Sequence, residues 1–237
     1  MLDMKGNKIT FFGHSTFSLT TQAGEVALLD SWVTTNPQCP DSLKKMKRLD
    51  AIFLTHAHSD HLGDLLALAK KHKPAVVAIF ETAQWIGAQG FSKQVKPMGK
   101  GGTLRVGEFE VTMTHAFHSN SIEDQGKLIY GGEPASFIVR MPGGLTIFHA
   151  GDTAVFGDMK LIAELYKPDI ACLPIGDNFT MGPREAAHAI RLLGVKQVIP
   201  MHYGTFPMLT GTPELLRAEC KDIAGLEIHA LKPGESL

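Results

Sequence analysis

The sequence of 237 residues lacks any run of apolar residues long enough to cross a membrane, so we expect no membrane-spanning helix. Residues 1–8 are polar and lead directly into an apolar strand, without the apolar segment of a signal peptide. The three cysteines lie far apart and show no C-x-x-C spacing, which is typical of isolated thiols in a reducing compartment. These absences favour a cytoplasmic protein without a membrane partner.

An excess of charge of one sign is also missing. The 23 lysines and arginines nearly balance the 24 aspartates and glutamates, which gives a formal net charge of -1. This balance supplies no attraction to nucleic acid, so we expect a small-molecule substrate. No stretch rich in serine, glycine or proline divides the chain, which predicts a single domain over residues 1–237. A homo-oligomer is compatible with this composition.

Short strands come first along the chain, and helix-strand units follow. Strands are predicted, in chain order, over residues 9–12, 16–20, 26–30, 75–80, 103–117, 135–140 and 144–148. The last third repeats a helix, a break and a strand, with helices over 158–166, 183–193 and 213–224 and strands over 169–175, 198–201 and 226–231. An α/β (α+β) fold with two sheets face to face and helices outside fits this order.

Residues 55–64, THAHSDHLGD, contain four side chains of the kinds that bind transition metals: His56, His58, Asp60 and His61. A strand is predicted directly before them and a helix over 62–72 directly after, so they occupy a strand-to-helix turn, where α/β folds present their chemistry. His56 and His58 can converge on one ion, while Asp60 and His61 face a second. A polar loop rich in histidine is the disfavoured alternative, because such a cluster has no partners in a core.

This H-x-H-x-D-H pattern after a strand resembles the signature of the metallo-β-lactamase superfamily, and the match is complete. Four further segments fall in the order of that superfamily and, with the motif, span nearly the whole chain: 8–15, 149–153, 173–177 and 199–203. The chain is most similar to the compact metal-dependent hydrolases that are related to the ascorbate-phosphate lactonases. The resemblance implies a four-layer αββα sandwich, whereas the order of strands and helices also fits a single mixed sheet.

The resemblance also implies a site for two divalent metal ions per chain. The residues that it assigns are His56, His58 and His118 for the first ion, Asp60, His61 and His202 for the second, and Asp152 as a bridge. Asp152 and His202 each follow a predicted strand, and strand ends can bring distant residues together. The histidine-rich set suits zinc, while manganese, iron and nickel stay open because ligand type alone does not choose among them.

We expect metal-assisted hydrolysis of an ester-like bond in a lactone, phosphodiester or thioester. Two ions would lower the pKa of a bridging water, and the resulting hydroxide would attack carbon or phosphorus. Asp60 would orient or deprotonate this nucleophile. The resemblance places His14 at the rim of the site, where it would contact the substrate or a carboxylate beside the metal. Asp30 would accept a hydrogen bond from a ligand histidine, although relatives commonly have proline where this chain has Ser31.

Several neighbouring residues need separate interpretations. His115 continues a strand face that is otherwise apolar and is expected to be structural, whereas His118 lies past the strand and can turn towards the ions. His149 precedes the turn of Asp152 and would support a ligand. The mouth of the site is expected to be formed by residues 119–133 together with Asn178, Phe179, Tyr203 and Phe206.

Three other functions fit part of the sequence. A diiron flavoprotein oxidoreductase of the same fold would have a carboxylate at the position of His58 and a flavin domain, which 237 residues do not accommodate. A nuclease or phosphodiesterase acting on nucleic acid would need an RNA-gripping arm or a basic, aromatic-rich stretch, and the sequence has neither. A non-catalytic metal-binding protein stays open, because a complete ligand set does not prove turnover.

Overall fold

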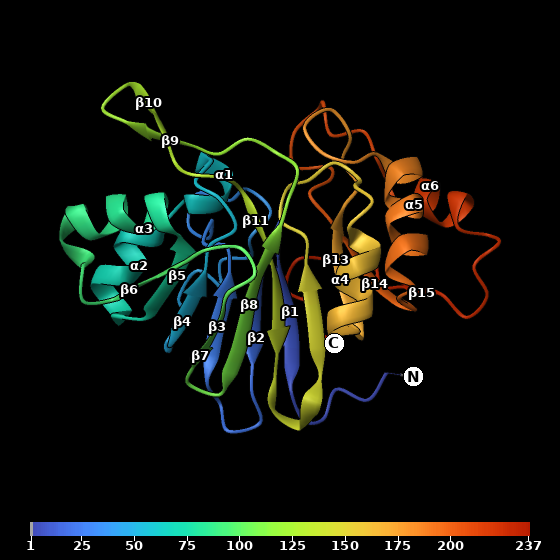
Figure 1. The fold of residues 1–237 in the computed structure, drawn as a ribbon, viewed down its shortest axis with the longest axis horizontal. Helices are drawn as coiled ribbons and strands as arrows, with labels where there is room; N and C mark the ends of the chain where they lie inside the picture. The colour runs from blue at the N-terminus through green and yellow to red at the C-terminus, as the bar shows by residue number, and fades with distance from the viewer. Residues whose placement is uncertain (1) are drawn as a thin grey trace.

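A computed structural model describes residues 2–237 as two β-sheets packed face to face (Figure 1). The first sheet contains, in spatial order, β1 (Lys8–Gly13), β2 (Thr16–Thr20), β3 (Val26–Leu29), β4 (Ala51–Phe53), β5 (Ala75–Ile79) and β6 (Val95–Met98). The second contains β15 (Glu227–Ile228), β14 (Gln197–Met201), β13 (Ile170–Pro174), β12 (Thr146–His149), β11 (Ala135–Arg140), β8 (Phe109–His115) and β7 (Thr103–Val106).

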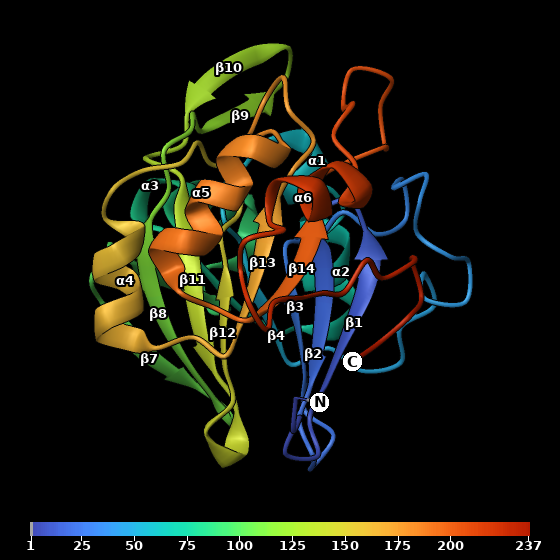
Figure 2. The same cartoon turned by 90° about the vertical axis from the view of Figure 1, so that its right-hand side faces the viewer.

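Helices cover the outer face of each sheet (Figures 1 and 2). On the first sheet lie α2 (Leu65–His72) and α3 (Phe80–Ile86), which continues into a π-helical turn at Gly87–Phe91. On the second lie α4 (Met159–Tyr166), α5 (Pro183–Leu193) and α6 (Pro213–Glu219). This four-layer αββα sandwich confirms the architecture implied by the resemblance. No helix within residues 2–237 has the length and apolar character needed to span a membrane.

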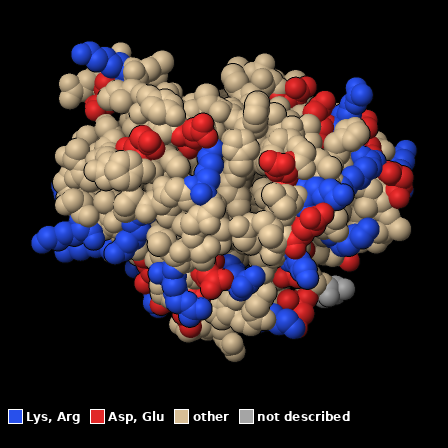
Figure 3. All heavy atoms as spheres, viewed as in Figure 1, with Lys and Arg blue, Asp and Glu red and all other residues tan. Residues whose placement is uncertain are grey.

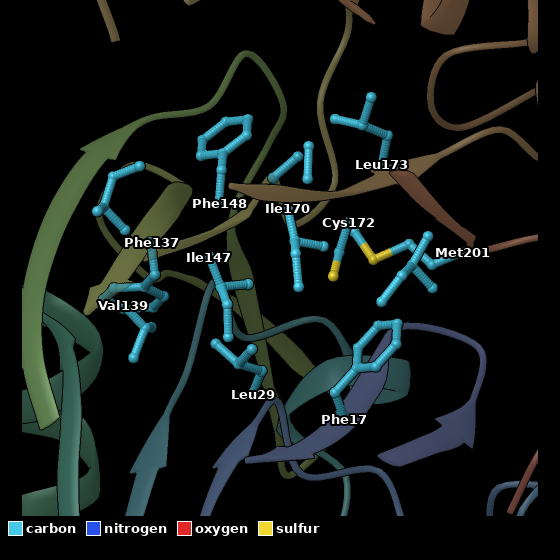
Figure 4. Close-up of a cluster of buried hydrophobic side chains, with 14 of the residues drawn as sticks. Phe17, Leu29, Phe137, Val139, Ile147, Phe148, Ile170, Cys172, Leu173 and Met201 are labelled. Carbon is cyan, nitrogen blue, oxygen red and sulfur yellow. The ribbon is translucent and has the colours of Figure 1, made fainter. Parts of the chain in front are cut away.

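An apolar core fills the space between the sheets (Figure 4). Phe17 and Leu29 of the first sheet belong to it together with Phe137, Ile147 and Phe148 of the second, and all five are inaccessible to solvent. A second cluster fills the space between the first sheet and α2 and α3. Strands β3, β4 and β5 are therefore buried on both faces, which explains why they are continuous apolar runs without alternation.

The parallel strands determine where the loops meet. Strands β3 to β6 run parallel to one another, and so do β12 to β15. Loops at the carboxyl ends of parallel strands share one edge of a sheet, and this edge is where open α/β sheets bind ligands. The loops after β4, β12 and β14 lie at such ends in the two sheets.

The helix predicted over 62–72 is wrong at its start. The chain forms a separate short helix α1 (Ser59–Leu62), and α2 begins only at Leu65. Gly63 separates the two helices with a φ of 40°, and a Cβ atom at this position would overlap the backbone of Trp32. Asp60 and His61 therefore lie in a short helix, whereas the sequence placed them in the turn before the helix.

Three further elements differ from the prediction. Residues 119–133, for which no strand was predicted, contain an antiparallel ribbon of β9 (Ser121–Asp124) and β10 (Lys127–Tyr130). Strand β6 was not predicted, and the strand predicted over 226–231 is only two residues long. The ribbon of β9 and β10 projects beyond the sandwich at the top of Figures 1 and 2.

Candidate metal centre

The structure brings all seven predicted ligands together where strands of both sheets end. His56 and His58 follow β4, and α1 carries Asp60 and His61 directly after them. From the second sheet come His118, Asp152 and His202, which follow β8, β12 and β14. Residues that are far apart in the sequence thus meet at one edge, because the two sheets face each other there.

Asp152 lies at the centre of this group. Its Oδ2 atom lies 3.0 Å from Nε2 of His202, 3.7 Å from Nε2 of His118 and 4.0 Å from Nε2 of His56. Its Oδ1 atom lies 3.3 Å from Nε2 of His61. Two atoms that each bind one ion at about 2.1 Å in tetrahedral geometry lie roughly 3.4 Å apart, so these separations suit shared ions.

The donor atoms fall into three overlapping groups, each with all of its atoms within 4.8 Å of one another. These groups are His56, His58 and His118; His14, Asp60, His61 and His202; and His56, His61 and Asp152. The first two reproduce the two ligand sets implied by the resemblance, with His14 added to the second. The third links them.

Several of these atoms lack a hydrogen-bond partner although they are buried. Nε2 of His61, Nε2 of His202 and Oδ1 of Asp152 are in this condition, because the short contacts between these side chains are not hydrogen bonds. A buried polar atom without a partner costs about 1–3 kcal/mol, so such atoms are rare unless something else satisfies them. Three of them gathered around one point fit a bound divalent cation, and the side chains present are those that a borderline metal prefers.

The histidines of the first group are held in the form that binds metal. Burial lowers the pKa of His56, His58 and His118, and the nearby His61 lowers each of them further. A neutral imidazole is the form that coordinates a metal ion. Burial alone would raise the pKa of Asp152, but His202 and His61 hold it well below its ordinary value, so this carboxylate is ionised.

Asp30 supports the histidine motif by accepting hydrogen bonds from Thr55 and His61. Its Oδ1 atom accepts hydrogen bonds from the backbone N–H and the hydroxyl of Thr55, at 2.8 and 3.0 Å. Its Oδ2 atom accepts one from Nδ1 of His61 at 2.6 Å, as the sequence predicted. Since the Thr55 hydroxyl donates to Asp30, it accepts from Nδ1 of His56 at 3.0 Å. Both histidines therefore donate from Nδ1 and turn Nε2 into the site, where Nε2 of His61 faces Asp152 and Nε2 of His56 accepts from Nδ1 of His58 at 3.0 Å.

Ser31 adds a connection that the sequence did not predict. Its backbone N–H donates to the carbonyl of His61 at 2.8 Å, and its hydroxyl donates to the carbonyl of Leu62 at 2.8 Å. Proline has no N–H and could not make the first of these bonds. The departure from the family pattern thus ties the turn after Asp30 directly to α1.

His14 lies inside the site rather than at the predicted rim, and it makes the predicted contact with a carboxylate. It is fully buried, with Nε2 at 3.1 Å from Oδ2 of Asp60 and Nδ1 at 2.9 Å from the hydroxyl of Thr205. Its carbonyl accepts from the backbone N–H of His202 at 2.8 Å. Burial lowers the pKa of His14 to about 4 despite the hydrogen bond to Asp60, so the ring is neutral and donates Nε2–H to that carboxylate.

Left-handed backbone conformations occur at three of these positions. The φ values are 56° at His14, 58° at Asp30 and 55° at His202. Each of these residues directly follows the last residue of a strand. Non-glycine residues in such conformations cost about 1–3 kcal/mol and persist only where the surroundings hold them. Here the hydrogen bonds of Asp30 and the pairing of His14 with His202 hold them.

Two further histidines lie outside the groups of donor atoms. His149 is buried, donates from Nε2 to the carbonyl of Ser15 at 3.0 Å, and accepts from the N–H of Gly151 at 3.3 Å. It therefore holds the turn that carries Asp152. His115 is half-buried on β8 and accepts from Nζ of Lys100 at 3.0 Å.

Comparisons with known proteins point to one family over most of the chain. Residues 27–203 match the family described as "Beta-lactamase superfamily domain". A "UPF0173 metal-dependent hydrolase" of Rubrobacter xylanophilus is 52% identical over 98% of this chain and 96% of its own, and one of Koribacter versatilis is 48% identical over 99% of each. The solved structure of Igni18, "a novel metallo hydrolase" from Ignicoccus hospitalis, has a TM-score of 0.86 at 31% identity, covering 98% of this chain and 97% of that one.

Proposed function

The chain belongs to the metallo-β-lactamase superfamily and is a metal-dependent hydrolase, and from this premise we propose that it cleaves an ester-like bond of a small molecule at a site for two divalent ions. The observation that carries the proposal is the position of Asp152 between two groups of donor atoms, with buried atoms left unpaired on both the carboxylate and the histidines. A single ion would leave part of this set without a partner.

Each ion would have its own set of side chains. The first would be held by His56, His58 and His118, the second by Asp60, His61 and His202, and Asp152 would be shared. Bound divalent ions would supply Lewis-acid chemistry, which lowers the pKa of water towards neutrality and stabilises the negative charge that develops during hydrolysis. Zinc suits this set best, and manganese, iron or nickel would fit the same ligands.

Asp60 is the residue that we assign to the proton of the attacking water. It lines the cavity above the metal ligands, and its side chain is 25% exposed. Burial alone would raise its pKa, but His61 and the hydrogen bond from His14 hold it below its ordinary value, so the carboxylate is ionised. Because His14 fixes Oδ2, the other oxygen stays available to accept a proton or to bind an ion.

A small-molecule substrate is favoured over nucleic acid. On the face shown in Figure 3, lysine and arginine side chains lie interspersed with acidic ones, without the basic stripe that a nucleic-acid backbone requires. The formal net charge of -1 agrees with this. We therefore place lactones, small phosphodiesters and thioesters ahead of polymers as substrates.

Hydrolysis by the metal-loaded protein tests this function. The protein is loaded with zinc or manganese and assayed against a lactone, a small phosphodiester and a thioester, with Asp60→Asn as the matched inactive variant. We expect metal-dependent turnover of at least one class, lost in the variant. Binding of metal without turnover of any of the three classes would contradict the proposed ester-like substrate.

A further inference from the structure

The ribbon of β9 and β10 turns one of its faces to the cavity. Within the ribbon, Leu128 is paired with Glu123, and Tyr130 with Ser121. Side chains alternate between the two faces of a strand, and directly paired residues share a face, so these four lie on the same side. Ser121, Glu123 and Leu128 line the cavity of about 400 Å³ whose floor includes Asp60, Asp152 and His202.

The opposite face and the base of the ribbon are attached to the body of the protein. Ile122 is buried, and Oδ2 of Asp124 accepts from Nε1 of Trp85 on α3 at 3.0 Å. At the base, Oδ1 of Asn120 accepts from the N–H of Ala57 at 2.8 Å, and its Nδ2 donates to the carbonyl of Gly131 at 2.8 Å. Ala57 lies between His56 and His58, so these bonds fix the ribbon relative to the histidine motif.

The cavity face of the ribbon carries an exposed apolar side chain, Leu128, beside its polar residues. Leu128 is 78% exposed, and Phe179, which lines the same cavity from the loop after β13, is 55% exposed. Large apolar side chains grouped at the mouth of a cavity are typical of surfaces that bind a ligand. Leu128 and Phe179 share this cavity with Asp60 and His202, so the group that they bind would be part of the substrate.

Charge at the mouth has one sign. Among the residues that line this cavity in the described chain, none is lysine or arginine, whereas Glu123 stands on the ribbon beside Leu128. A phosphate or carboxylate on the outer part of a substrate would meet this carboxylate without a basic partner. A neutral, apolar group would meet Leu128 and Phe179.

We propose that the substrates are neutral esters or lactones that carry an alkyl or aryl group, and that Leu128 and Phe179 hold this group while Glu123 disfavours anionic substrates. The proposal rests on the proposed function for the position of the scissile bond at Asp60. It departs from the similarity to ascorbate-phosphate lactonases, whose substrate is phosphorylated. The binding of the apolar group can be measured without turnover.

Binding of alkyl hydroxamates provides the test, because the hydroxamic acid head group chelates metal ions with loss of one proton and their chain length can be varied. Acetohydroxamate, hexanohydroxamate and octanohydroxamate are titrated calorimetrically into the zinc-loaded protein. Each buried methylene contributes up to about 0.8 kcal/mol, so we expect the dissociation constant to fall about two- to fourfold per added methylene. The monohydroxamate of adipic acid, which ends in a carboxylate, should bind more weakly than hexanohydroxamate.

Variants of exposed residues identify the surface. Leu128→Ser and Phe179→Ser should each reduce the dependence on chain length, and Glu123→Gln should reduce the penalty for the carboxylate. The matched control is Leu161→Ser, because Leu161 is 50% exposed on α4, outside the cavity. This variant should retain the full dependence on chain length.

Two results would overturn the proposal. One is an affinity that does not change with chain length in the unmodified protein. The other is an unchanged dependence in Leu128→Ser accompanied by a change in sedimentation, which would make the ribbon an interface between two copies of the chain. Absence of ester hydrolysis with chain-dependent hydroxamate binding would overturn the proposed function and leave the apolar site in place.

Discussion

Oδ2 of Asp30 lies 2.6 Å from Nδ1 of His61, and both side chains are inaccessible to solvent. This pair fixes the imidazole so that its second nitrogen, Nε2, faces Oδ1 of Asp152. Burial alone would lower the pKa of His61, but the carboxylates of Asp152, Asp30 and Asp60 raise it well above its ordinary value. Asp30 is thus a positioning residue for His61 in the metal centre.

Replacing Asp30 by asparagine tests this positioning role. We expect Asp30→Asn to weaken metal binding by about 10- to 100-fold, as is typical when the hydrogen-bond partner of a ligand is lost. Competition with a chromophoric chelator measures the affinity. Asp50→Asn is the matched control, because Asp50 also accepts a backbone N–H of the first sheet, from Val26 at 2.8 Å, but lies away from the ligands. Equal affinity in the two variants would contradict the role.

Asp60→Asn should leave the fold intact and reduce hydrolysis by about 100-fold or more, the range expected for loss of a general base. The amide keeps the size of the carboxylate but can neither accept the proton nor bind a metal ion as well. Steady-state turnover and thermal unfolding are the two measurements. Near-normal turnover with metal bound would show that another group handles the proton.

His118 and His115 are predicted to differ in their effect on metal binding. Nε2 of His118 lies 3.7 Å from Oδ2 of Asp152, whereas His115 contacts Lys100. We expect His118→Ala to weaken binding at the first ion site by at least about 10- to 100-fold. His115→Ala should mainly lower the free energy of unfolding, by about 1 kcal/mol. Loss of the ion in His115→Ala but not in His118→Ala would reverse the assignment.

All three cysteines should be unreactive in the folded protein. Cys39, Cys172 and Cys220 are buried and unpaired. Burial raises the pKa of Cys39 to about 11 and raises that of Cys172 beyond this, and a thiol rather than a thiolate is a poor nucleophile. Titration with an aromatic disulfide reagent at pH 8 should detect no thiol before denaturation and three after it. Rapid reaction of a native thiol would contradict the packing described for it.

The motif in residues 55–64 and the resemblance to a known superfamily supplied the seven candidate ligands, and the structure brings them together where apolar strands end. Asp152 and His202 are examples, since their strands are central and strongly apolar. The buried position of His14 could not be predicted in this way. It depends on Thr205, which is 191 residues away in the sequence, and on Asp60 in another loop.

The ribbon of β9 and β10 escaped prediction for a different reason. Its turn, Gln125-Gly126, has positive φ at both residues, 50° and 76°. Turns of this kind usually carry Asn-Gly or Asp-Gly, so the local signal was weak. The whole of β10 is exposed, so no buried face imposed an alternation of apolar and polar residues. A surface element that serves a cavity rather than the core leaves little trace in a single sequence.

The number of metal ions per chain tests the central claim most directly. Protein purified without chelator is saturated with zinc or manganese, freed of loosely bound metal, and its metal content is measured by mass spectrometry against protein concentration. Seven converging ligands with Asp152 between the two groups predict close to two ions per chain. A content that never exceeds one ion under metal repletion would contradict the bridging position of Asp152 and the two-ion site.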